Sequence, residues 1–159
     1  MEESILRGSF NRILHLMARF GPGTTTLRPF LHRLRGVKIG KNVFIGDDVY
    51  IENMHPEDVE IQEGASIVLR SIIMSHFRER GKVIIEKNAR IGMACSVSAN
   101  DGKTVRIGEG SVLGTGSHVS HDVPPFTFVS PPPVQTICKT TIPLTPDTSF
   151  QEWKKGLIK

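Results

Sequence analysis

Residues 36–52 read Gly-Val-Lys-Ile-Gly-Lys-Asn-Val-Phe-Ile-Gly-Asp-Asp-Val-Tyr-Ile-Glu, and an isoleucine returns every six residues, at Ile39, Ile45 and Ile51. The same interval continues through the middle of the chain, where the aliphatic positions are Ile39, Ile45, Ile51, Ile61, Ile67, Ile73, Ile85, Ile91, Val97, Ile107, Leu113 and Val119. Two residues before each lies a small or β-branched side chain: Val37, Val43, Val49, Val59, Ala65, Ser71, Val83, Ala89, Cys95, Val105, Ser111 and Ser117. The chain is therefore built on a six-residue repeat.

A repeat this short buries its apolar face only against neighbouring copies of itself, and hexapeptide repeats are typical of a parallel β-helix. Three hexads, about 18 residues, make one triangular coil. The aliphatic side chain points into the prism, and the small side chain fills the space beside it. We expect positive φ angles at the glycines that follow the aliphatic residue, namely Gly40, Gly46, Gly92, Gly108 and Gly114. The sequence predicts an all-β solenoid.

The repeat is interrupted three times, always after the third hexad of a coil. Four extra residues follow Ile51, six follow Ile73 and four follow Val97. Because each coil contains three hexads, we expect all three insertions to emerge at the same corner and to stack. They comprise residues 53–58, 75–82 and 99–104. Loops gathered at one corner of a solenoid typically form its binding face.

Length and composition agree with a single globular domain of 159 residues. The content of leucine, isoleucine and valine is too high for a disordered chain. No stretch approaches the roughly 20 apolar residues of a membrane span, and the acidic start Met1-Glu2-Glu3 is unlike a signal peptide. The chain has only two cysteines, and Cys95 occupies a small-residue position of the repeat, which argues against a disulfide framework. These features favour a cytoplasmic protein.

Positive charge is concentrated at the start of the chain. The first 36 residues hold six arginines and two glutamates, and so account for the whole net charge of +4. Apolar residues follow helical spacing from Leu6 to Phe20, and Gly21-Pro22-Gly23 ends the predicted helix. A second short helix, with Pro29 near its start, is predicted to end at Gly36.

We divide the chain into three parts. Residues 1–36 are interpreted as an amphipathic helical cap over the open end of the prism, and residues 37–134 as the β-helix domain. Residues 135–159 are predicted to form an extended tail and a short helix, packed on the prism or on a neighbouring subunit. A second interpretation of residues 5–20 is attachment to an anionic membrane surface, which would place the protein at the inner face of the membrane.

Three stretches of this sequence resemble the hexapeptide-repeat acyltransferases, specifically the sugar O-acetyltransferases of the maltose, galactoside and colanic-acid type. They are residues 36–46, Ser75-His76-Phe77, and the segment from Ile107-Gly108-Glu109-Gly110 to Asp122-Val123-Pro124-Pro125. The resemblance covers roughly residues 35–134. It implies a left-handed β-helix, a homotrimer with sites between subunits, and acetyl transfer from acetyl-CoA to a sugar or glycan-precursor hydroxyl. We expect no metal ion and no nucleic-acid partner.

By this resemblance His76 is the general base. A sugar hydroxyl is a poor nucleophile until a base removes its proton, and histidine titrates near neutral pH. The base needs an orienting partner, for which Glu52 and Asn53 from the preceding insertion and the nearby Glu79 are candidates. Asn53 is our preferred contact to the acceptor, together with Glu52, Glu79 and Arg78.

Coenzyme A is expected to lie along the later coils. The positions that match the family are Met93, Ala94, Thr115, Ser120 and His121, with Lys139 as the nearest later candidate for a phosphate contact. This sequence departs from its relatives at several of these places. It has Thr115 where alanine is common, His121 where lysine is common and Arg90 where tryptophan is common, and it ends the repeat with Ser130-Pro131-Pro132-Pro133.

Other functions use the same fold, because a fold alone does not choose the chemistry. These departures are also compatible with a non-catalytic solenoid that serves as an assembly surface. A γ-class carbonic anhydrase needs three zinc-binding histidines, for which His55, His76, His118 and His121 are available, but its His-Gly ligand motif is missing. Serine and amino-sugar N-acyltransferases are further alternatives.

Overall fold

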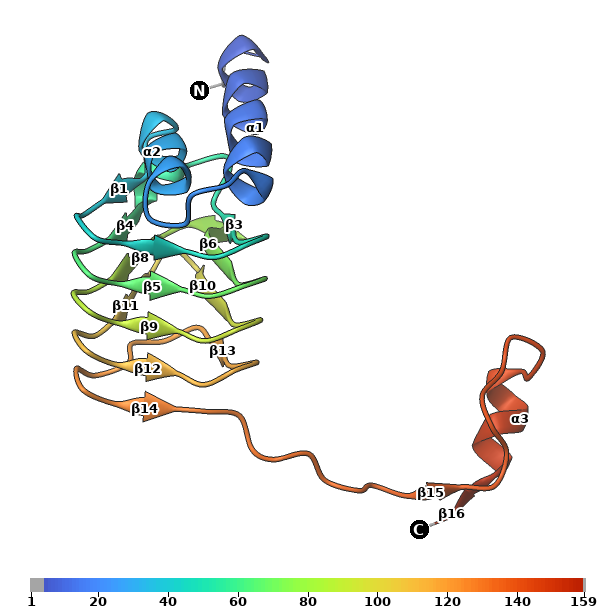
Figure 1. Ribbon diagram of the computed structural model, residues 1–159. Helices are drawn as coiled ribbons and strands as arrows, with labels where there is room; N and C mark the ends of the chain where they lie inside the picture. Colours follow the sequence, from blue (N-terminus) through green and yellow to red (C-terminus); the bar gives the residue numbers. More distant parts are fainter. Residues whose placement is uncertain (1–4, 159) are drawn as a thin grey trace.

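The computed structural model describes residues 5–158, so the acidic start Met1-Glu2-Glu3 lies outside the described residues. Two helices, α1 (Ile5–Phe20) and α2 (Leu27–Leu34), precede a three-sided stack of coils. An extended arm follows the last coil and carries the helix α3 (Phe150–Lys155) (Figure 1). No helix within residues 5–158 has the length and hydropathy needed to cross a bilayer.

Three parallel sheets form the faces of the prism within the described chain. The first contains β1 (Lys38–Ile39), β4 (Val59–Ile61), β8 (Lys82–Ile85) and β11 (Thr104–Ile107). The second contains β2 (Phe44–Ile45), β5 (Ser66–Ile67), β9 (Arg90–Ile91), β12 (Val112–Leu113) and β14 (Phe128–Val129). The third contains β3 (Tyr50–Ile51), β6 (Ile72–Phe77), β10 (Ser96–Asn100) and β13 (His118–Val119). The predicted β-solenoid is confirmed.

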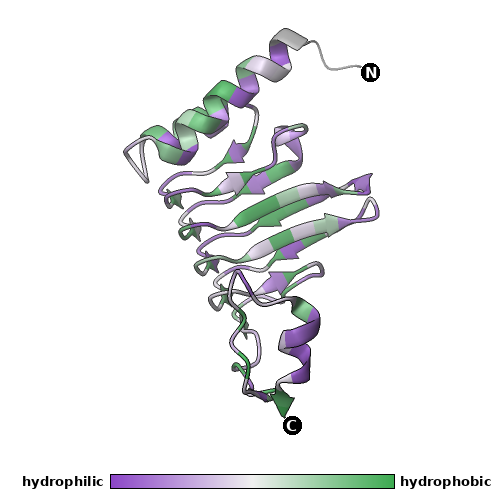
Figure 2. Cartoon of the chain, turned by 90° about the vertical axis from the view of Figure 1, so that its right-hand side faces the viewer, coloured by the Kyte–Doolittle hydropathy of each residue, from purple (hydrophilic) through white to green (hydrophobic). Residues whose placement is uncertain are grey.

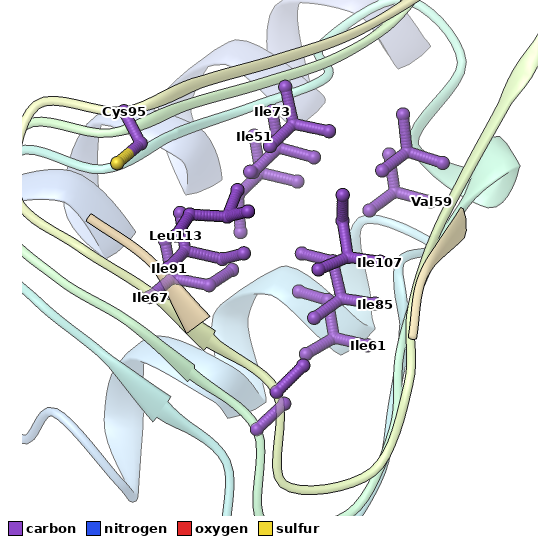
Figure 3. Close-up of a cluster of buried hydrophobic side chains, with 14 of the residues drawn as sticks. Ile51, Val59, Ile61, Ile67, Ile73, Ile85, Ile91, Cys95, Ile107 and Leu113 are labelled. Carbon is purple, nitrogen blue, oxygen red and sulfur yellow. The ribbon is translucent and has the colours of Figure 1, made fainter. Parts of the chain in front are cut away.

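The repeat positions fill the interior of this prism. Isoleucines of successive coils pair directly, as Ile39 does with Ile61 and Ile61 with Ile85. They stack in columns along the axis, as Figure 3 shows for Ile61, Ile85 and Ile107. The twelve small positions of the repeat are all buried, and of the aliphatic positions only Ile39, in the first coil, is partly exposed. Burial of these columns is the main stabilising contribution to the solenoid.

The glycines of the repeat have a different role from the one expected. None of the five adopts a positive φ; the positive φ angles of the turns fall instead on residues such as Asn42, Asp48 and Ala94. A Cβ atom at Gly40 would lie 2.5 Å from the backbone nitrogen of Glu63 in the next coil. Glycine is needed there because two coils approach too closely for any side chain.

Three arginines of α2 and the turn after it close the first coil. Each donates a hydrogen bond to an edge carbonyl on a different face of the prism. The pairs are Arg33 with Ile39, Arg28 with Ile45 and Arg35 with Ile51, at N–O distances of 3.0, 3.2 and 3.2 Å. Unpaired carbonyls at a sheet edge are costly to bury and prone to recruit other strands. The arginines of this region therefore bind the prism itself.

Helix α1 packs on the prism with an unexpected face. The side chains that it buries are Asn11, Leu14, His15 and Ala18. Of the residues that follow the predicted apolar spacing, Phe10, Ile13, Met17 and Phe20 are instead 51–66% exposed. Hydrophobic residues recur along this helix, which lies across the end of the coils (Figure 2). The cap is held by polar and small side chains, and the apolar face of α1 remains uncovered.

The C-terminal part leaves the prism altogether. Residues 131–137 are extended and exposed, and α3 lies far from the coils (Figure 1). Helix α3 begins after Ser149, whose hydroxyl accepts a hydrogen bond from the backbone amide of Glu152, and ends at Gly156 as the sequence predicts. Beside it β15 (Lys139–Thr140) pairs with β16 (Leu157–Ile158). Of the two packing partners predicted for this tail, the prism of its own chain is not contacted by α3 (Figure 1), and packing on a neighbouring subunit stays a prediction.

Candidate active site

The three insertions lie one below another at a single corner, as the repeat predicts. The first contains a short 3-10 helix, η1 (Pro56–Asp58), and the second forms a hairpin in which β7 (Glu79–Arg80) pairs back onto β6. The third insertion hydrogen bonds to the second through the backbone of Asp101 and Phe77. Arg80 links the second to the first, because its Nε donates to Asp58 at 2.5 Å.

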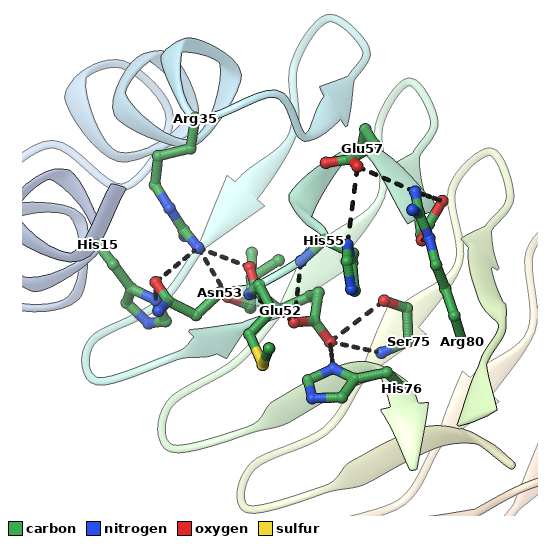
Figure 4. A network of polar contacts seen from close by, with 12 residues as sticks. His15, Arg35, Glu52, Asn53, His55, Glu57, Ser75, His76 and Arg80 are labelled. Atoms are coloured by element: carbon green, nitrogen blue, oxygen red, sulfur yellow. Dashed lines mark hydrogen bonds and ion pairs between the residues drawn. The ribbon is translucent and has the colours of Figure 1, made fainter. Parts of the chain in front are cut away.

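Glu52 and His76 form a hydrogen-bonded pair at the root of these insertions (Figure 4). Glu52 follows β3, and His76 lies near the end of β6 in the next coil. The His76 Nδ1 atom lies 2.6 Å from Glu52 Oε2. The Glu52 side chain is fully buried, whereas that of His76 is 33% exposed. The pair therefore presents one face of an imidazole to solvent and keeps its carboxylate inside.

Four further donors surround the Glu52 carboxylate. Oε1 accepts from the backbone amides of Met54 and His55, at 2.8 and 3.3 Å. Oε2 also accepts from the amide and the hydroxyl of Ser75, at 3.1 and 3.2 Å. Burial alone would raise the pKa of Glu52, but the hydrogen bonds from His76 and these amides outweigh burial and hold its pKa below the ordinary value.

An ionised Glu52 fixes the tautomer of His76. A carboxylate only accepts hydrogen bonds, so the Nδ1 atom of a neutral His76 must carry the proton. Its Nε2 atom then has a free lone pair, which is the arrangement that a general base needs. A histidine oriented by a buried carboxylate is a common feature of catalytic sites.

The helical cap reaches this pair through Asn53. The Oδ1 atom of Asn53 lies 3.2 Å from His15 Nδ1 of α1 and accepts from Arg35 at 3.4 Å. Arg35 also donates to the backbone oxygen of Glu52 at 2.5 Å and contacts His32 Nδ1 at 2.8 Å. The backbone on either side of the Glu52 carboxylate is thus fixed by residues of the cap.

The hairpin after His76 does not bring its charged residues to the pair. Arg78 occupies the tip with a positive φ, is 77% exposed and lies 4.0 Å from Asp101. Glu79 is exposed on β7. Within residues 5–158, neither side chain hydrogen bonds to Glu52 or His76. The structure therefore separates these two predicted acceptor contacts from the Glu52–His76 pair.

The residues expected to contact coenzyme A divide into three groups. Met93, Ala94 and Thr115 lie at the corner that precedes the third sheet, where the amide of Gly116 donates to the Met93 carbonyl. Ser120 and His121 follow β13, at the other end of that sheet. Lys139 lies in the C-terminal arm, far from the coils (Figure 1). Only the first two groups adjoin the sheet that carries His76.

A groove of about 200 Å³ runs over the outer face of that sheet, between these two groups. Its lining residues are Ile72, Met74, Phe77, Ser96, Ser98, Asn100 and His118. The Oδ1 atom of Asn100 is buried and has no hydrogen-bond partner among the described residues. The groove thus combines an apolar floor with an unused polar acceptor, close to the insertions that hold His76.

Sequence reasoning missed the residues that support the pair. The hydroxyl and the amide of Ser75 both donate to Glu52. Ser75 directly precedes His76 in the sequence, so its place beside the pair was predictable. His15, His32 and Arg35 gave no such signal, because their place beside Asn53 depends on how the helices dock. Among residues 5–158, no cluster of three or more histidine, cysteine, aspartate or glutamate side chains is arranged to hold a metal ion.

Comparison with known proteins gives the following picture, although no protein-family model matches the chain. Over 109 residues, or 64% of its length, the chain is 32% identical to the bifunctional protein GlmU of Syntrophomonas wolfei. The apoenzyme of soybean serine acetyltransferase superposes with a TM-score of 0.54 and 24% identity over 82% of this chain. A hexapeptide-repeat acetyltransferase from Vibrio cholerae covers 79% of this chain and 86% of its own, with a TM-score of 0.55 and 19% identity. The chain has the left-handed hexapeptide-repeat β-helix fold.

This fold is shared with the soybean and Vibrio cholerae structures. The likeness concerns the β-helix, since the chain spans 23% of GlmU and 55% of the soybean enzyme. Within the hexapeptide-repeat β-helix, the Glu52–His76 pair is the feature with the clearest chemical meaning.

Proposed function

We propose that the protein is an acetyl-CoA-dependent O-acetyltransferase with a sugar or glycan-precursor hydroxyl as acceptor and His76 as general base. The observation that carries this proposal is the 2.6 Å contact between His76 Nδ1 and the buried Glu52 carboxylate. It leaves Nε2 of this partly exposed ring unprotonated. The hexapeptide-repeat fold, which acetyltransferases share, supports acyl transfer as the reaction.

In the proposed reaction, His76 Nε2 accepts the proton of the acceptor hydroxyl while the hydroxyl oxygen attacks the thioester carbonyl. A carbon–oxygen bond forms, the carbon–sulfur bond breaks, and the proton passes from His76 to the departing thiolate of coenzyme A. Glu52 stabilises the imidazolium that forms between these steps, as a buried carboxylate does in other histidine-based sites. General base catalysis of this kind contributes about 10²- to 10⁴-fold to the rate.

The groove on the third sheet is the proposed path of the acyl donor. It leads from the corner with Met93, Ala94 and Thr115 toward the insertions, and the strand β10 covers roughly 15 Å of that path. The groove is open along one side in a single chain, which supports a site completed by a neighbouring subunit. The proposed assembly is a homotrimer, and the proposed location is the cytoplasm.

The proposal is tested by measuring coenzyme A release from acetyl-CoA with sugars, nucleotide-sugars and serine as acceptors, for wild type and His76→Ala. We expect turnover with at least one hydroxyl acceptor and a loss of at least about 100-fold in kcat for His76→Ala. Calorimetry with coenzyme A should give the same affinity for both proteins, because Nε2 acts on the acceptor.

Three results would replace the proposal. Robust transfer that survives His76→Ala unchanged would show that another group is the base. No transfer with any acceptor, together with no binding of coenzyme A, would favour a non-catalytic assembly protein. Stoichiometric bound zinc with hydration of carbon dioxide would instead identify a γ-class carbonic anhydrase.

A further inference from the structure

A second pocket, of about 260 Å³, lies between α1 and the end of β3. Its lining comes from one face of α1 and from the strand and loop next to Glu52: Arg12, His15, Leu16, Arg19, Tyr50 and Asn53. Neither the groove of the third sheet nor the Glu52–His76 pair includes these six side chains. The pocket is therefore a separate feature on the cap side of the site.

The pocket is electropositive. Arg12 is exposed and forms no ion pair within the described chain. Arg19 pairs with Asp48, and its guanidinium lies 5.9 Å from the Tyr50 ring. The Glu52 carboxylate is turned away toward His76. Arg12 thus supplies a positive charge that no carboxylate of the described chain neutralises.

Its polar groups are arranged for a ligand with both donors and acceptors. Asn53 Oδ1 accepts from Arg35 and from His15 Nδ1, so the Asn53 amide nitrogen is left to donate. The same contact places the proton of His15 on Nδ1. Its Nε2 atom is then an acceptor, and it is buried without a hydrogen-bond partner in a side chain only 4% exposed. Burial and the nearby Arg35 lower the pKa of His15 to about 4, which keeps this ring neutral.

The pocket also lies next to the Glu52–His76 pair. Asn53 directly follows Glu52 in the chain, and its side chain stands between His15 and the Glu52–His76 pair (Figure 4). A molecule held at Asn53 by one end can therefore extend toward His76 with the other.

We propose that this pocket binds the anionic group of the acceptor, a phosphate monoester or a carboxylate, while an acceptor hydroxyl reaches His76. The assignment rests on the proposed function for the identity of the ligand as an acceptor. Arg12 provides the charge, and the Asn53 amide and the Tyr50 hydroxyl provide hydrogen bonds.

Calorimetry with three matched probes tests the assignment: glucose, glucose 1-phosphate and glucuronate. The proteins are wild type, Arg12→Gln, Tyr50→Phe and the control Arg106→Gln, whose arginine is exposed on β11 of another face. We expect at least one anionic probe to bind at least 10-fold more tightly than glucose. Arg12→Gln should remove about 10-fold or more of that difference, and Arg106→Gln should leave it intact.

The better of the two anionic probes identifies the anion as phosphate or carboxylate. Equal binding of all three probes, or an anion preference that Arg12→Gln leaves unchanged, overturns the assignment. Because binding is measured without acetyl-CoA, an Arg12-dependent preference in a protein that shows no transfer would sustain the pocket and reject the proposed function. Transfer to neutral sugars, together with no tighter binding of the anionic probes, would sustain the proposed function and reject the pocket.

A different observation concerns the outer surface of the cap. Eight large apolar side chains of the two helices and the residues between them are 36–66% exposed: Phe10, Ile13, Leu16, Met17, Phe20, Leu27, Phe30 and Leu34. Neither α1 nor α2 contains an aspartate or glutamate. Exposed arginines accompany them at Arg7 and Arg12. An apolar surface on helices that carry arginines and no acidic side chain fits an anionic lipid interface better than a protein surface of mixed charge.

We infer that this apolar surface of the cap docks on an anionic membrane. Co-sedimentation with vesicles tests it, using phosphatidylcholine alone and with about one third phosphatidylglycerol. We expect wild type to sediment with the anionic vesicles and the double variant Ile13→Ser/Met17→Ser to lose most of that binding. Both positions are exposed, so the fold should be retained, which circular dichroism checks.

The matched control is Val134→Ser/Ile137→Ser, which removes two exposed apolar side chains from the arm at the other end of the molecule. It should sediment like wild type. Absence of wild-type binding, or equal loss in both double variants, rejects the inference. Lipid-independent self-association that Ile13→Ser/Met17→Ser abolishes would assign the same surface to a second copy of the chain.

Discussion

At the scale of single residues, Glu52 organises the candidate site. Its carboxylate accepts five hydrogen bonds within the described chain, from Met54, His55, His76 and twice from Ser75. A buried carboxylate with this many donors stays ionised, and an ionised carboxylate imposes one tautomer on His76. Glu52 therefore acts through His76 as a positioning residue.

Glu52→Gln should lower kcat for acetyl transfer by about 100-fold or more. The amide carries a donor where the carboxylate only accepted, so it no longer holds the proton on His76 Nδ1. Because the donor groove is untouched, KM for acetyl-CoA should change little. The comparison is Glu63→Gln, an exposed glutamate on another part of the prism, which should retain wild-type rates. A Glu52→Gln enzyme with wild-type kcat would show that the pair is structural.

His15 should make the docking of α1 sensitive to pH. Its pKa is lowered to about 4 in the folded protein, first by burial and then by Arg35, from 6.5 as the ordinary value. The unfolded chain therefore binds more protons between pH 6.5 and 4, and stability falls as the pH falls through this window. At pH 5 this amounts to about 2 kcal/mol for His15. Buried His32, whose pKa is also lowered, acts in the same direction.

Amide hydrogen exchange of α1 at pH 7.5 and pH 5 measures this effect as a change in the opening free energy. The titratable and charged groups that face His15 are His32, Tyr50, Arg35, Arg19 and Glu52. In His15→Gln the difference in opening free energy between the two pH values should be smaller by about 2 kcal/mol, the contribution of His15. An unchanged difference would assign the pH dependence to His32 or to the other groups.

At the scale of elements, each coil is held by its columns of aliphatic side chains. Ile85 is fully buried in β8 between Ile61 and Ile107, so Ile85→Ala should cost about 2–5 kcal/mol in free energy of unfolding. Ile72 points outward from β6 and is 41% exposed, so Ile72→Ala should cost less than about 1 kcal/mol. Urea unfolding followed by circular dichroism compares the two. Similar losses would mean that the outward face is packed in solution.

The sequence predicted the elements well where a short period repeats. The coils and the common corner of the insertions agree with the prediction, because burial of an aliphatic residue at every sixth position admits one arrangement. Both N-terminal helices also agree with the prediction made from their apolar spacing and glycine ends. The orientation of α1 was not predictable from its own spacing. The docking of the two helices depends on Arg28, Arg33 and Arg35, which donate hydrogen bonds to edge carbonyls. It also depends on His15, which contacts Asn53, a residue 38 positions later in the chain. Polar contacts between distant segments leave no periodic signal.

At the scale of the whole molecule, the third sheet exposes a groove that a single chain leaves open, and its lining residues Phe77 and Ile72 are 51% and 41% exposed. A homotrimer would cover this face and complete the site. Sedimentation equilibrium at micromolar concentration should therefore give a mass three times the 17.6 kDa of one chain. A monomeric mass under conditions that support acetyl transfer would place the whole site within one chain.

The sheet edges at the two ends of the prism are capped to different extents. Guanidinium groups bind the edge carbonyls of the first coil. At the other end, within residues 5–158, β11 is followed only by a single bridge from Ile107 to Val123, and no further strand pairs with β13 or β14. In a stack where every coil is held only by its neighbours, loss of structure begins at the end with the weaker boundary. Under heat or mechanical pull, this protein should unravel coil by coil from its C-terminal end, and the Glu52–His76 pair, which lies next to the capped end, should be among the last parts to come apart.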